Sequence, residues 1–417
     1  MKEFHNDWCS EAIDKLRLSW SLDPKTIFLN HGSYGAVPKI VLEAQRKLED
    51  EIERDPVEFM MDAYPLRIGE ARQSLAKFVG ANPERIAFIR NATEGINALF
   101  NSLPLAQNDE VLVSSHGYNA CIEAMRHCAK MRGFDVKTWQ LPWPEPTSKS
   151  IEESLLERLS ENTKVVVIDH ITSPTALRLP IERLILLLQE RGIITVVDGA
   201  HGPGQEVLEL DALGADYYIG NLHKWLCNPR GTAFLYNRTP EERPIYPVVI
   251  SHGSSAWVKP RLNRFCEAFD WAGTQNPSAW CTVPHTIRWF ESQKTNEGNS
   301  LIESNRQRTT AVANHFVEHP LAQTRLAPDQ RLAMVLLEIR PEADTFVPTL
   351  PNQKSPLQQQ LYEEFDIQVP VISIENRTYL RLSLHAYVRE SDIQVLHRAL
   401  EKLYRDAVLQ CWEDRGP

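Results

Sequence analysis

Short apolar stretches alternate with longer amphipathic stretches between about residue 70 and residue 236. The short stretches predict strands at residues 85–90, 109–115, 134–141, 164–170, 193–198, 215–220 and 231–237. The longer stretches have apolar residues at helical spacing and cover residues 92–103, 119–133, 150–161 and 181–192. This alternation predicts an α/β fold, in which a mostly parallel seven-stranded sheet is flanked by helices. In such a fold the chemistry takes place at the carboxyl ends of the strands.

The pattern changes after about residue 285. Helical stretches there lead to RLAMVLLEIR at 331–340 and TYLRLSLHAYV at 378–388, which predict strands of a smaller α+β domain. Residues 340–356 are proline-rich and predict a loop, and residues 390–410 predict a final helix. We therefore expect three regions, namely an N-terminal segment at 1–30 that packs near the small domain, a large domain at 31–284 and a small C-terminal domain at 285–417.

The amino-acid composition and charge of the chain exclude several classes of function. The 417-residue chain is 42% apolar and 24% charged, and it has a net charge of −10 and a pI near 5.8. It has no basic stripe that would suit nucleic acid, and its longest apolar runs are too short to span a bilayer. The amino terminus lacks the apolar core of a signal peptide, and the seven cysteines form no C-x-x-C pair. We expect a cytoplasmic protein with reduced thiols, no metal site and no membrane partner.

Two predicted strands are followed by residues that suit a flat, anionic ligand. Ala92 and Thr93 follow the strand at 85–90 and open a helix, where backbone N–H groups and a hydroxyl can bind an anion. Tyr118 follows the strand at 109–115, and its ring can stack on a flat ligand. Taken singly, these residues are better explained as a plain helix cap and a half-buried tyrosine.

Two charged residues follow later strands. Asp198 ends the apolar stretch IITVVD, where a buried carboxylate is costly unless it is paired, and a protonated pyridine nitrogen would pair with it. Lys224 lies between His223 and Trp225, with apolar stretches on both sides. Burial disfavours the lysine cation and gives a nucleophilic amine. The alternatives are a structural aspartate bound to backbone amides and an exposed lysine, and the apolar neighbours argue against the exposed lysine.

Together these residues form the set that pyridoxal phosphate requires. Its phosphate binds a helix N-terminus, its ring stacks on an aromatic side chain, its pyridine nitrogen pairs with an aspartate and its aldehyde reacts with a lysine. A nicotinamide-dependent dehydrogenase would instead need a G-x-G-x-x-G turn after an early strand, and GAHGPG lacks that spacing. The residues therefore favour an enzyme that uses pyridoxal phosphate.

The sequence also resembles fold-type I pyridoxal-phosphate enzymes of the aminotransferase class-V family, in particular isopenicillin N epimerases and ergothioneine-pathway C–S lyases. The resemblance runs from about residue 25 to about residue 390 and rests on LNHGSYGAVP, NATEGINAL, TSPTA, VVDGAHGPG, GNLHKW and WAGTQNPSAW. One position departs from the family, because Ala176 ends TSPTA where relatives often carry glycine.

The resemblance implies a role for each matching residue. Lys224 would be the Schiff-base lysine and the base at Cα, and Tyr118 would be the second catalytic candidate and the stacking ring, with His116 a weaker candidate for stacking. The implied cofactor-binding residues are Ala92, Thr93, Tyr118, Ser173, Asp198, His201, Asn221, His223, Lys224, Gly273 and Thr274. The implied substrate-binding residues are Asn30, His31, Asn119 and Arg381.

Two of these roles need separate comment. Gly273 and Thr274 would reach the phosphate across a subunit interface, which implies a homodimer with shared sites. Arg381 would bind the substrate carboxylate through its planar guanidinium, whereas the residue pattern alone favours an arginine on the surface of a strand.

The implied activity is that of an enzyme acting at Cα or Cβ of an amino acid or a cysteine S-conjugate, as an epimerase or a C–S β-lyase. Class-V aminotransferase activity is the alternative, because these reactions share their first steps. Cysteine desulfurases carry a catalytic cysteine on a loop of the small domain, and residues 340–356 contain none. A non-catalytic binding protein of this fold is expected to lack Lys224 or Asp198, and the chain has both.

Overall fold

The computed structural model describes residues 10–257, 259–294, 298–317, 321–324, 326–339 and 353–413. Residues 340–352 of the predicted proline-rich loop and residues 1–9 of the predicted N-terminal segment lie outside this range. The chain forms two compact units. The larger unit comprises Tyr34–Ser173 and Leu177–Gln293, and the smaller unit comprises Met1–Ser33, Pro174–Ala176 and Lys294–Pro417. The domain bounds inferred from the sequence stay a prediction.

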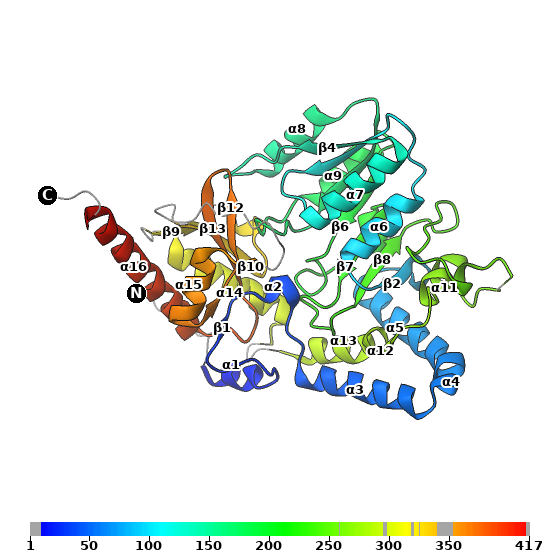
Figure 1. Cartoon of the computed structure of the whole chain (residues 1–417), viewed down its shortest axis with the longest axis horizontal. Helices are drawn as coiled ribbons and strands as arrows, with labels where there is room; N and C mark the ends of the chain where they lie inside the picture. Colours follow the sequence, from blue (N-terminus) through cyan, green and yellow to red (C-terminus); the bar gives the residue numbers. More distant parts are fainter. Residues whose placement is uncertain are drawn as a thin grey trace. The chain divides into compact units, whose positions relative to one another are not determined.

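A seven-stranded sheet forms the centre of the larger unit (Figure 1). Its strands lie in the order β2 (Ile86–Ile89), β8 (Ala233–Asn237), β7 (Tyr217–Asn221), β6 (Ile194–Asp198), β5 (Thr163–Asp169), β3 (Glu110–Ser114) and β4 (Asp135–Trp139). Strand β8 runs antiparallel to both of its neighbours, and the pairs from β7 to β4 are all parallel. The predicted α/β fold with a mostly parallel sheet is therefore confirmed.

The helices that cover the sheet present an apolar face to it. Ile96 and Leu99 of one helix and Met125 of the next share a core cluster with Val111 and Val167 of the strands. The helices of the larger unit are α3 (Lys39–Arg54), α4 (Pro56–Glu58), α5 (Tyr64–Phe78), α6 (Ala92–Ser102), α7 (Asn119–Arg132), α8 (Ser148–Arg158), α9 (Ile181–Gln189), α10 (Leu210–Leu213), α11 (Arg264–Asp270), α12 (Ser278–Cys281) and α13 (Val283–Ser292). A π-helix at Phe59–Ala63 and 3₁₀ turns at Pro83–Arg85 and His252–Ser254 complete the unit, and the short helix α2 (His31–Tyr34) spans the boundary between the units.

The smaller unit is built on an antiparallel sheet of four strands. Their order is β12 (Val371–Ile374), β13 (Arg377–Ser383), β10 (Met334–Ile339) and β9 (Ala322–Thr324). The other elements are α1 (Ser10–Arg17), β1 (Ile27–Phe28), α14 (Leu301–Phe316), a 3₁₀ turn at Pro328–Gln330, α15 (Pro356–Phe365), β11 (Ile367–Gln368) and α16 (Glu390–Glu413). Strand β1 pairs with β11, which attaches the N-terminal segment to this unit. Among the described residues, no helix has the length and apolar character needed to cross a membrane.

Candidate active site

Four neighbouring strands of the larger unit each end in a buried polar residue. Ser114 ends β3, Asp169 ends β5, Asp198 ends β6 and Asn221 ends β7. All four are at most 6% exposed, and Lys224, which follows β7, is 9% exposed. Because these strands are parallel, their carboxyl ends lie at one edge of the sheet. We call these five residues the strand-end cluster.

Lys224 is held in a chain of hydrogen bonds. Its Nζ lies 3.0 Å from Nε2 of His201, and the indole Nε1 of Trp225 donates to Nδ1 of His201 at 3.3 Å. An indole N–H is only a donor, so Nδ1 of His201 accepts from Trp225. Nε2 of His201 is then available for a hydrogen bond with Nζ of Lys224. Lys224 and Trp225 of the HKW stretch thus both contact the ring of His201.

The backbone around Lys224 is closely packed. A Cβ on Gly35 would lie 2.0 Å from the carbonyl oxygen of His223, and the φ angle of Gly35 is +69°, so only glycine fits. Cys227, three residues after Lys224, is fully buried, and burial raises the pKa of its thiol far above the usual range. The thiol of Cys227 is therefore unsuited to nucleophilic chemistry.

Asp198 is poised to bind a cation. Its Oδ1 accepts a hydrogen bond from the N–H of Ala200 at 3.1 Å, and its Oδ2 accepts from Sγ of Cys121 at 3.4 Å. Burial raises the pKa of the Asp198 carboxyl, while the Ala200 amide, the charge of Lys224 and the Cys121 thiol oppose that rise. A buried carboxylate of this kind is strongly stabilised by a cationic partner.

The N-terminus of α6 is already partly occupied by side chains. Oδ1 of Asn221 accepts from the N–H of Ala92 at 2.9 Å, and Oδ1 of Asn91 accepts from the N–H of Glu94 at 2.9 Å. Asn221 thus fixes this helix to the end of β7. Of the two residues predicted to bind phosphate here, Thr93 offers its N–H and hydroxyl, whereas the N–H of Ala92 has an acceptor within the chain.

His223 is neutral at physiological pH. Burial and the charge of Lys224 lower the pKa of His223 to about 4. Its Nδ1 lies 3.1 Å from the carbonyl oxygen of Thr232, so Nδ1 carries the proton and donates it. Nε2 is left as an acceptor.

The two candidate stacking residues have different surroundings. Tyr118 precedes α7 and is 46% exposed. His116 is buried in an edge-on contact with Trp143, with ring centroids 5.1 Å apart, and burial lowers the pKa of His116 to about 4. This geometry favours Tyr118, and Asn119 is the first residue of α7.

A family model matches most of this architecture. The description of that model is aminotransferase class-V, and it matches residues 41–334. The chain belongs to the aminotransferase class-V family. As a member of this family it is a pyridoxal-phosphate-dependent enzyme.

Characterised class-V relatives cover nearly the whole chain. Isopenicillin N epimerase of Streptomyces clavuligerus is 29% identical over 92% of this chain and 96% of its own length. Hercynylcysteine sulfoxide lyase of Schizosaccharomyces pombe is 23% identical over 93% of this chain and 96% of its own. A probable chloroplastic L-cysteine desulfhydrase of Arabidopsis thaliana is 25% identical over 92% of this chain and 84% of its own.

Solved structures share the class-V fold. The cystine C–S lyase C-DES superposes with a TM-score of 0.76 at 20% identity, over 90% of this chain and 97% of the other. The cysteine desulfurase CsdA of Escherichia coli superposes with a TM-score of 0.75 at 18% identity, over 94% and 98%. At these identities the superpositions establish the fold.

The class-V enzyme has residues at its strand ends that fit pyridoxal phosphate. A buried lysine amine, a buried carboxylate, a helix N-terminus and a partly exposed aromatic ring are the groups that the aldehyde, pyridine nitrogen, phosphate and ring of the cofactor need. Lys224, Asp198, Thr93 and Tyr118 are groups of these four kinds, and all four belong to the larger unit.

The remaining predicted cofactor residues lie on loops. Ser173 is half-buried just after the TSPTA turn begins, and the φ of Ala176 at the end of that turn is +56°. This left-handed conformation is the one that glycine adopts without strain, which explains why relatives often have glycine there. Gly273 and the exposed Thr274 lie between α11 and α12.

The predicted substrate residues of the smaller unit form their own network. Arg381 lies on β13 and is only 4% exposed, so it is not the surface arginine that the residue pattern alone favours. Its Nη2 donates to Oγ of Ser33 at 2.9 Å, and Oγ of Ser33 in turn donates to Oδ1 of Asn30 at 2.5 Å. This network fixes the guanidinium of Arg381.

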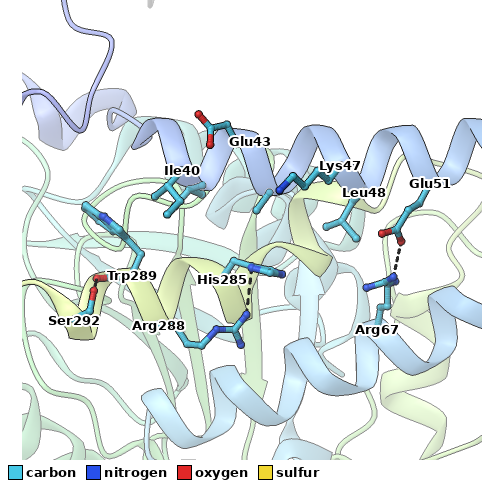
Figure 2. A pocket seen from close by; sticks show the side chains of 12 residues that line it. Ile40, Glu43, Lys47, Leu48, Glu51, Arg67, His285, Arg288, Trp289 and Ser292 are labelled. Atoms are coloured by element: carbon cyan, nitrogen blue, oxygen red, sulfur yellow. Dashed lines mark hydrogen bonds and ion pairs between the residues drawn. The ribbon is translucent and has the colours of Figure 1, made fainter.

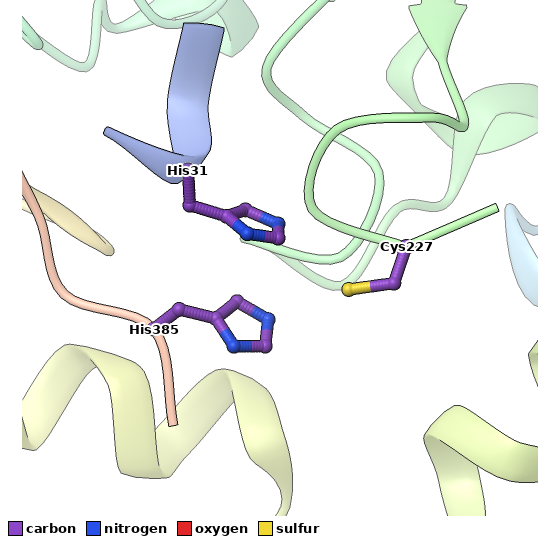
Figure 3. Close-up of side chains that lie close together, drawn as sticks. All are labelled: His31, Cys227 and His385. Carbon is purple, nitrogen blue, oxygen red and sulfur yellow. The ribbon is translucent and has the colours of Figure 1, made fainter. Parts of the chain in front are cut away.

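His31 belongs to an aromatic group in the same unit. Its ring stacks on that of His385 with centroids 4.2 Å apart (Figure 3). Its Nδ1 lies 2.8 Å from the hydroxyl of Tyr387. Burial and the charges of His31 and Arg308 lower the pKa of His385 well below the usual range. His385 is therefore neutral and serves as a flat support for His31.

Sequence reasoning missed several residues of these networks. Trp225 and Cys121 contact His201 and Asp198 directly, and Ser33 contacts Arg381. Their positions depend on tertiary packing, so the sequence carries no signal for them. Asp169 is different, because it ends an apolar stretch just as Asp198 does, and that signal was available.

The larger unit also has a groove between α3, α5 and α13, with a volume of about 530 Å³ (Figure 2). Its titratable lining residues are Glu43, Lys47, Glu51, Arg67, His285 and Arg288. Arg67 forms an ion pair with Glu51, and Arg288 donates to Nδ1 of His285 at 3.2 Å. We call this feature the α3–α13 groove, and no predicted site residue lines it.

Proposed function

We propose that this class-V enzyme acts at Cα or Cβ of an amino acid or a cysteine S-conjugate, as an epimerase or a C–S β-lyase. The observation that carries the proposal is the hydrogen-bond chain from Trp225 through His201 to the buried amine of Lys224. Relatives named isopenicillin N epimerase and hercynylcysteine sulfoxide lyase, each covering more than 90% of the chain, support this choice of reactions.

The residues divide the work as follows. Bound pyridoxal phosphate supplies an electron sink for negative charge at the substrate Cα. Lys224 takes the Cα proton at Nζ, and His201 orients that amine. Asp198 holds a proton on the pyridine nitrogen through an ionic hydrogen bond. Thr93 and His223 bind the phosphate, and Tyr118 covers the ring.

The substrate is oriented by its carboxylate. We propose that Arg381 binds this group with both guanidinium nitrogens, since its side chain is already fixed by Ser33. Asn30, His31 and Asn119 are proposed to contact the rest of the substrate. Epimerisation needs an acid on the face opposite Lys224, and we assign that role to Tyr118. In a C–S lyase the same tyrosine serves as a stacking group.

One experiment separates the two reactions. The holoenzyme is incubated with amino acids and with cysteine S-conjugates in deuterated buffer, and pyruvate release and Cα deuterium exchange are recorded together. Exchange with inversion and without pyruvate identifies an epimerase, whereas pyruvate from an S-conjugate identifies a C–S lyase. Formation of a 2-oxo acid that retains the whole side chain would identify an aminotransferase. Absence of all three with every substrate class would overturn the proposal.

We also propose a homodimer in which Gly273 and Thr274 reach the partner's phosphate site. The exposure of Thr274 supports this, as does a group of exposed apolar residues between residues 248 and 257, including Ile250 and the 96% exposed Trp257. Sedimentation at assay concentration is expected to show a dimer, and a fully active monomer would contradict the assignment. A cytoplasmic location is proposed because the five cysteines whose side chains are described are all free thiols.

A further inference from the structure

Asp169 is a second buried carboxylate beside Asp198. The two residues end the neighbouring parallel strands β5 and β6 and are paired in register. In-register neighbours on parallel strands lie roughly 4.8 Å apart and point to the same face of the sheet. Asp169 is 4% exposed and Asp198 is 6% exposed, so bulk solvent screens their charges only weakly.

The two carboxyl groups have unequal surroundings. Asp198 accepts from the Ala200 amide and the Cys121 thiol, and the charge of Lys224 acts on it. Asp169 accepts at Oδ2 from Oγ of Ser114 at 3.0 Å, and among the described residues it has no ion pair. The negative charge is therefore better stabilised on Asp198.

Two negative charges at this spacing in a buried site oppose each other, so one carboxyl group retains a proton. Burial and the charge of Asp198 raise the pKa of Asp169 well above its usual range, with Ser114 opposing the rise. The nearby thiol of Cys121 also stays protonated, because burial and both carboxylates raise its pKa. Asp198 is thus the member of the group that carries charge.

We propose that Asp169 is a positioning residue that stays protonated at neutral pH and leaves Asp198 as the single anion for the pyridine nitrogen of the cofactor. The pair then carries one negative charge, which balances one pyridinium charge. Two anions would leave an uncompensated buried charge after the cofactor binds. This inference rests on the proposed role of Asp198.

Infrared spectroscopy of the holoenzyme tests this proposal directly. A protonated carboxylic acid has a carbonyl stretch distinct from that of a carboxylate, and it shifts in deuterated buffer. We expect this band at neutral pH in the wild type and its loss in Asp169→Asn. The exposed Asp135 gives a matched control, and Asp135→Asn is expected to keep the band. Absence of the band in the wild type, or its persistence in Asp169→Asn, would overturn the proposal.

Cofactor binding gives a second readout. Asparagine resembles a protonated aspartic acid in shape and charge, so Asp169→Asn is expected to bind pyridoxal phosphate within about threefold of the wild-type Kd. A loss of about tenfold or more would show that the charge of Asp169 is needed and would contradict the proposal. If Asp169→Asn does not fold, Ser114→Ala replaces it. Removing the hydroxyl that stabilises the anion is expected to make the infrared band persist to higher pH, and an unchanged titration would count against the proposal.

The role of Asp198 is tested separately. Asp198→Asn is expected to weaken cofactor binding and to change the near-visible spectrum of the holoenzyme. If that variant binds and absorbs as the wild type does, and the wild-type holoenzyme shows the Asp169 band, the proposed role of Asp198 fails but the protonation of Asp169 in the wild type stands.

Discussion

The strand-end cluster and the α3–α13 groove belong to the same unit and both contain charged side chains, but they differ in what surrounds those charges. In the cluster the polar groups are at most 9% exposed, and each contacts another polar group within the chain. In the groove Arg67 and Glu51 are 37% and 38% exposed and pair with each other (Figure 2). Buried polar groups have shifted pKa values and fixed orientations, and both properties are typical of catalytic sites. The α3–α13 groove has a volume of about 530 Å³ but lacks such buried polar groups among the described residues, so we interpret it as a surface feature.

The largest expected effect follows from removing Lys224. Lys224→Ala is expected to lower kcat by at least about 10²- to 10⁴-fold, because the base at Cα is lost. It should also abolish covalent attachment of the cofactor, which is checked by borohydride reduction followed by peptide mass mapping. Lys47→Ala in the groove is the matched control and is expected to leave both properties unchanged. Cofactor trapped on another lysine of the Lys224→Ala protein would show that the assignment is wrong.

Arg381 is a buried charged residue of the smaller unit, and we propose that it binds the substrate. Substitution of Arg381 tests whether burial identifies a binding residue in this unit as well. Losing two charge-assisted hydrogen bonds typically costs about 2 to 4 kcal/mol, so Arg381→Ala is expected to lower kcat/KM roughly thirty- to a thousandfold. The absorbance of the bound cofactor should not change. Arg381→Lys should restore only part of the loss, because an ammonium group lacks the planar fork.

The groove again provides the control for this comparison. Arg288→Ala removes an arginine of the same kind from a site that has no proposed ligand, and steady-state kinetics should be unaffected. Amides of the substrates, which lack the carboxylate, should be poor for the wild type and little changed by Arg381→Ala. If Arg381→Ala bound amino acids as well as the wild type does, Arg381 would not be the residue that binds the substrate carboxylate.

His223 gives a smaller, pH-dependent effect. Its Nε2 is an acceptor in the free chain, and a phosphate oxygen is also an acceptor, so binding requires a proton on Nε2. The pKa of His223 is about 4 before binding, and a nearby phosphate raises it. Between these two pKa values the complex holds one more proton than the free protein. Affinity for the cofactor therefore falls as pH rises, by up to about tenfold per pH unit.

The matched variant for this prediction is His223→Gln. Its amide donates a hydrogen bond without taking up a proton, so the pH dependence assigned to His223 should disappear. Kd is measured by fluorescence titration of both proteins at several pH values above 4. The phosphate of the cofactor itself ionises with a pKa of about 6 and affects both proteins equally. The difference between their two slopes of log Kd against pH therefore reports on His223 alone. Identical slopes would show that His223 does not carry the proton.

The sequence could predict some of these features but not others, and the reason is physical. The alternation of apolar and helical stretches predicted the α/β fold, because the period of each stretch fixes its element and short connections limit the topology. Asp198 and Lys224 were predicted because a charge next to an apolar strand is unusual and visible in one dimension. Trp225 and Cys121 were not, because an indole or a thiol on an apolar stretch is normal and acquires its partner only when the strands assemble. The assigned roles of the site residues stay predictions.

The smallest effect is expected for the ion pair of the groove. Arg67 and Glu51 are more than a third exposed, so water screens their attraction and their ordering has an entropic cost. A double-mutant cycle with Arg67→Ala and Glu51→Ala is expected to give a coupling of about 0 to 1 kcal/mol in urea unfolding, and salt should reduce it further. Turnover by both variants should equal that of the wild type. A coupling above about 3 kcal/mol is the size found for buried pairs, and it would show that the groove is covered in solution. In that case the exposed fractions of the charged side chains would no longer distinguish the groove from the strand-end cluster.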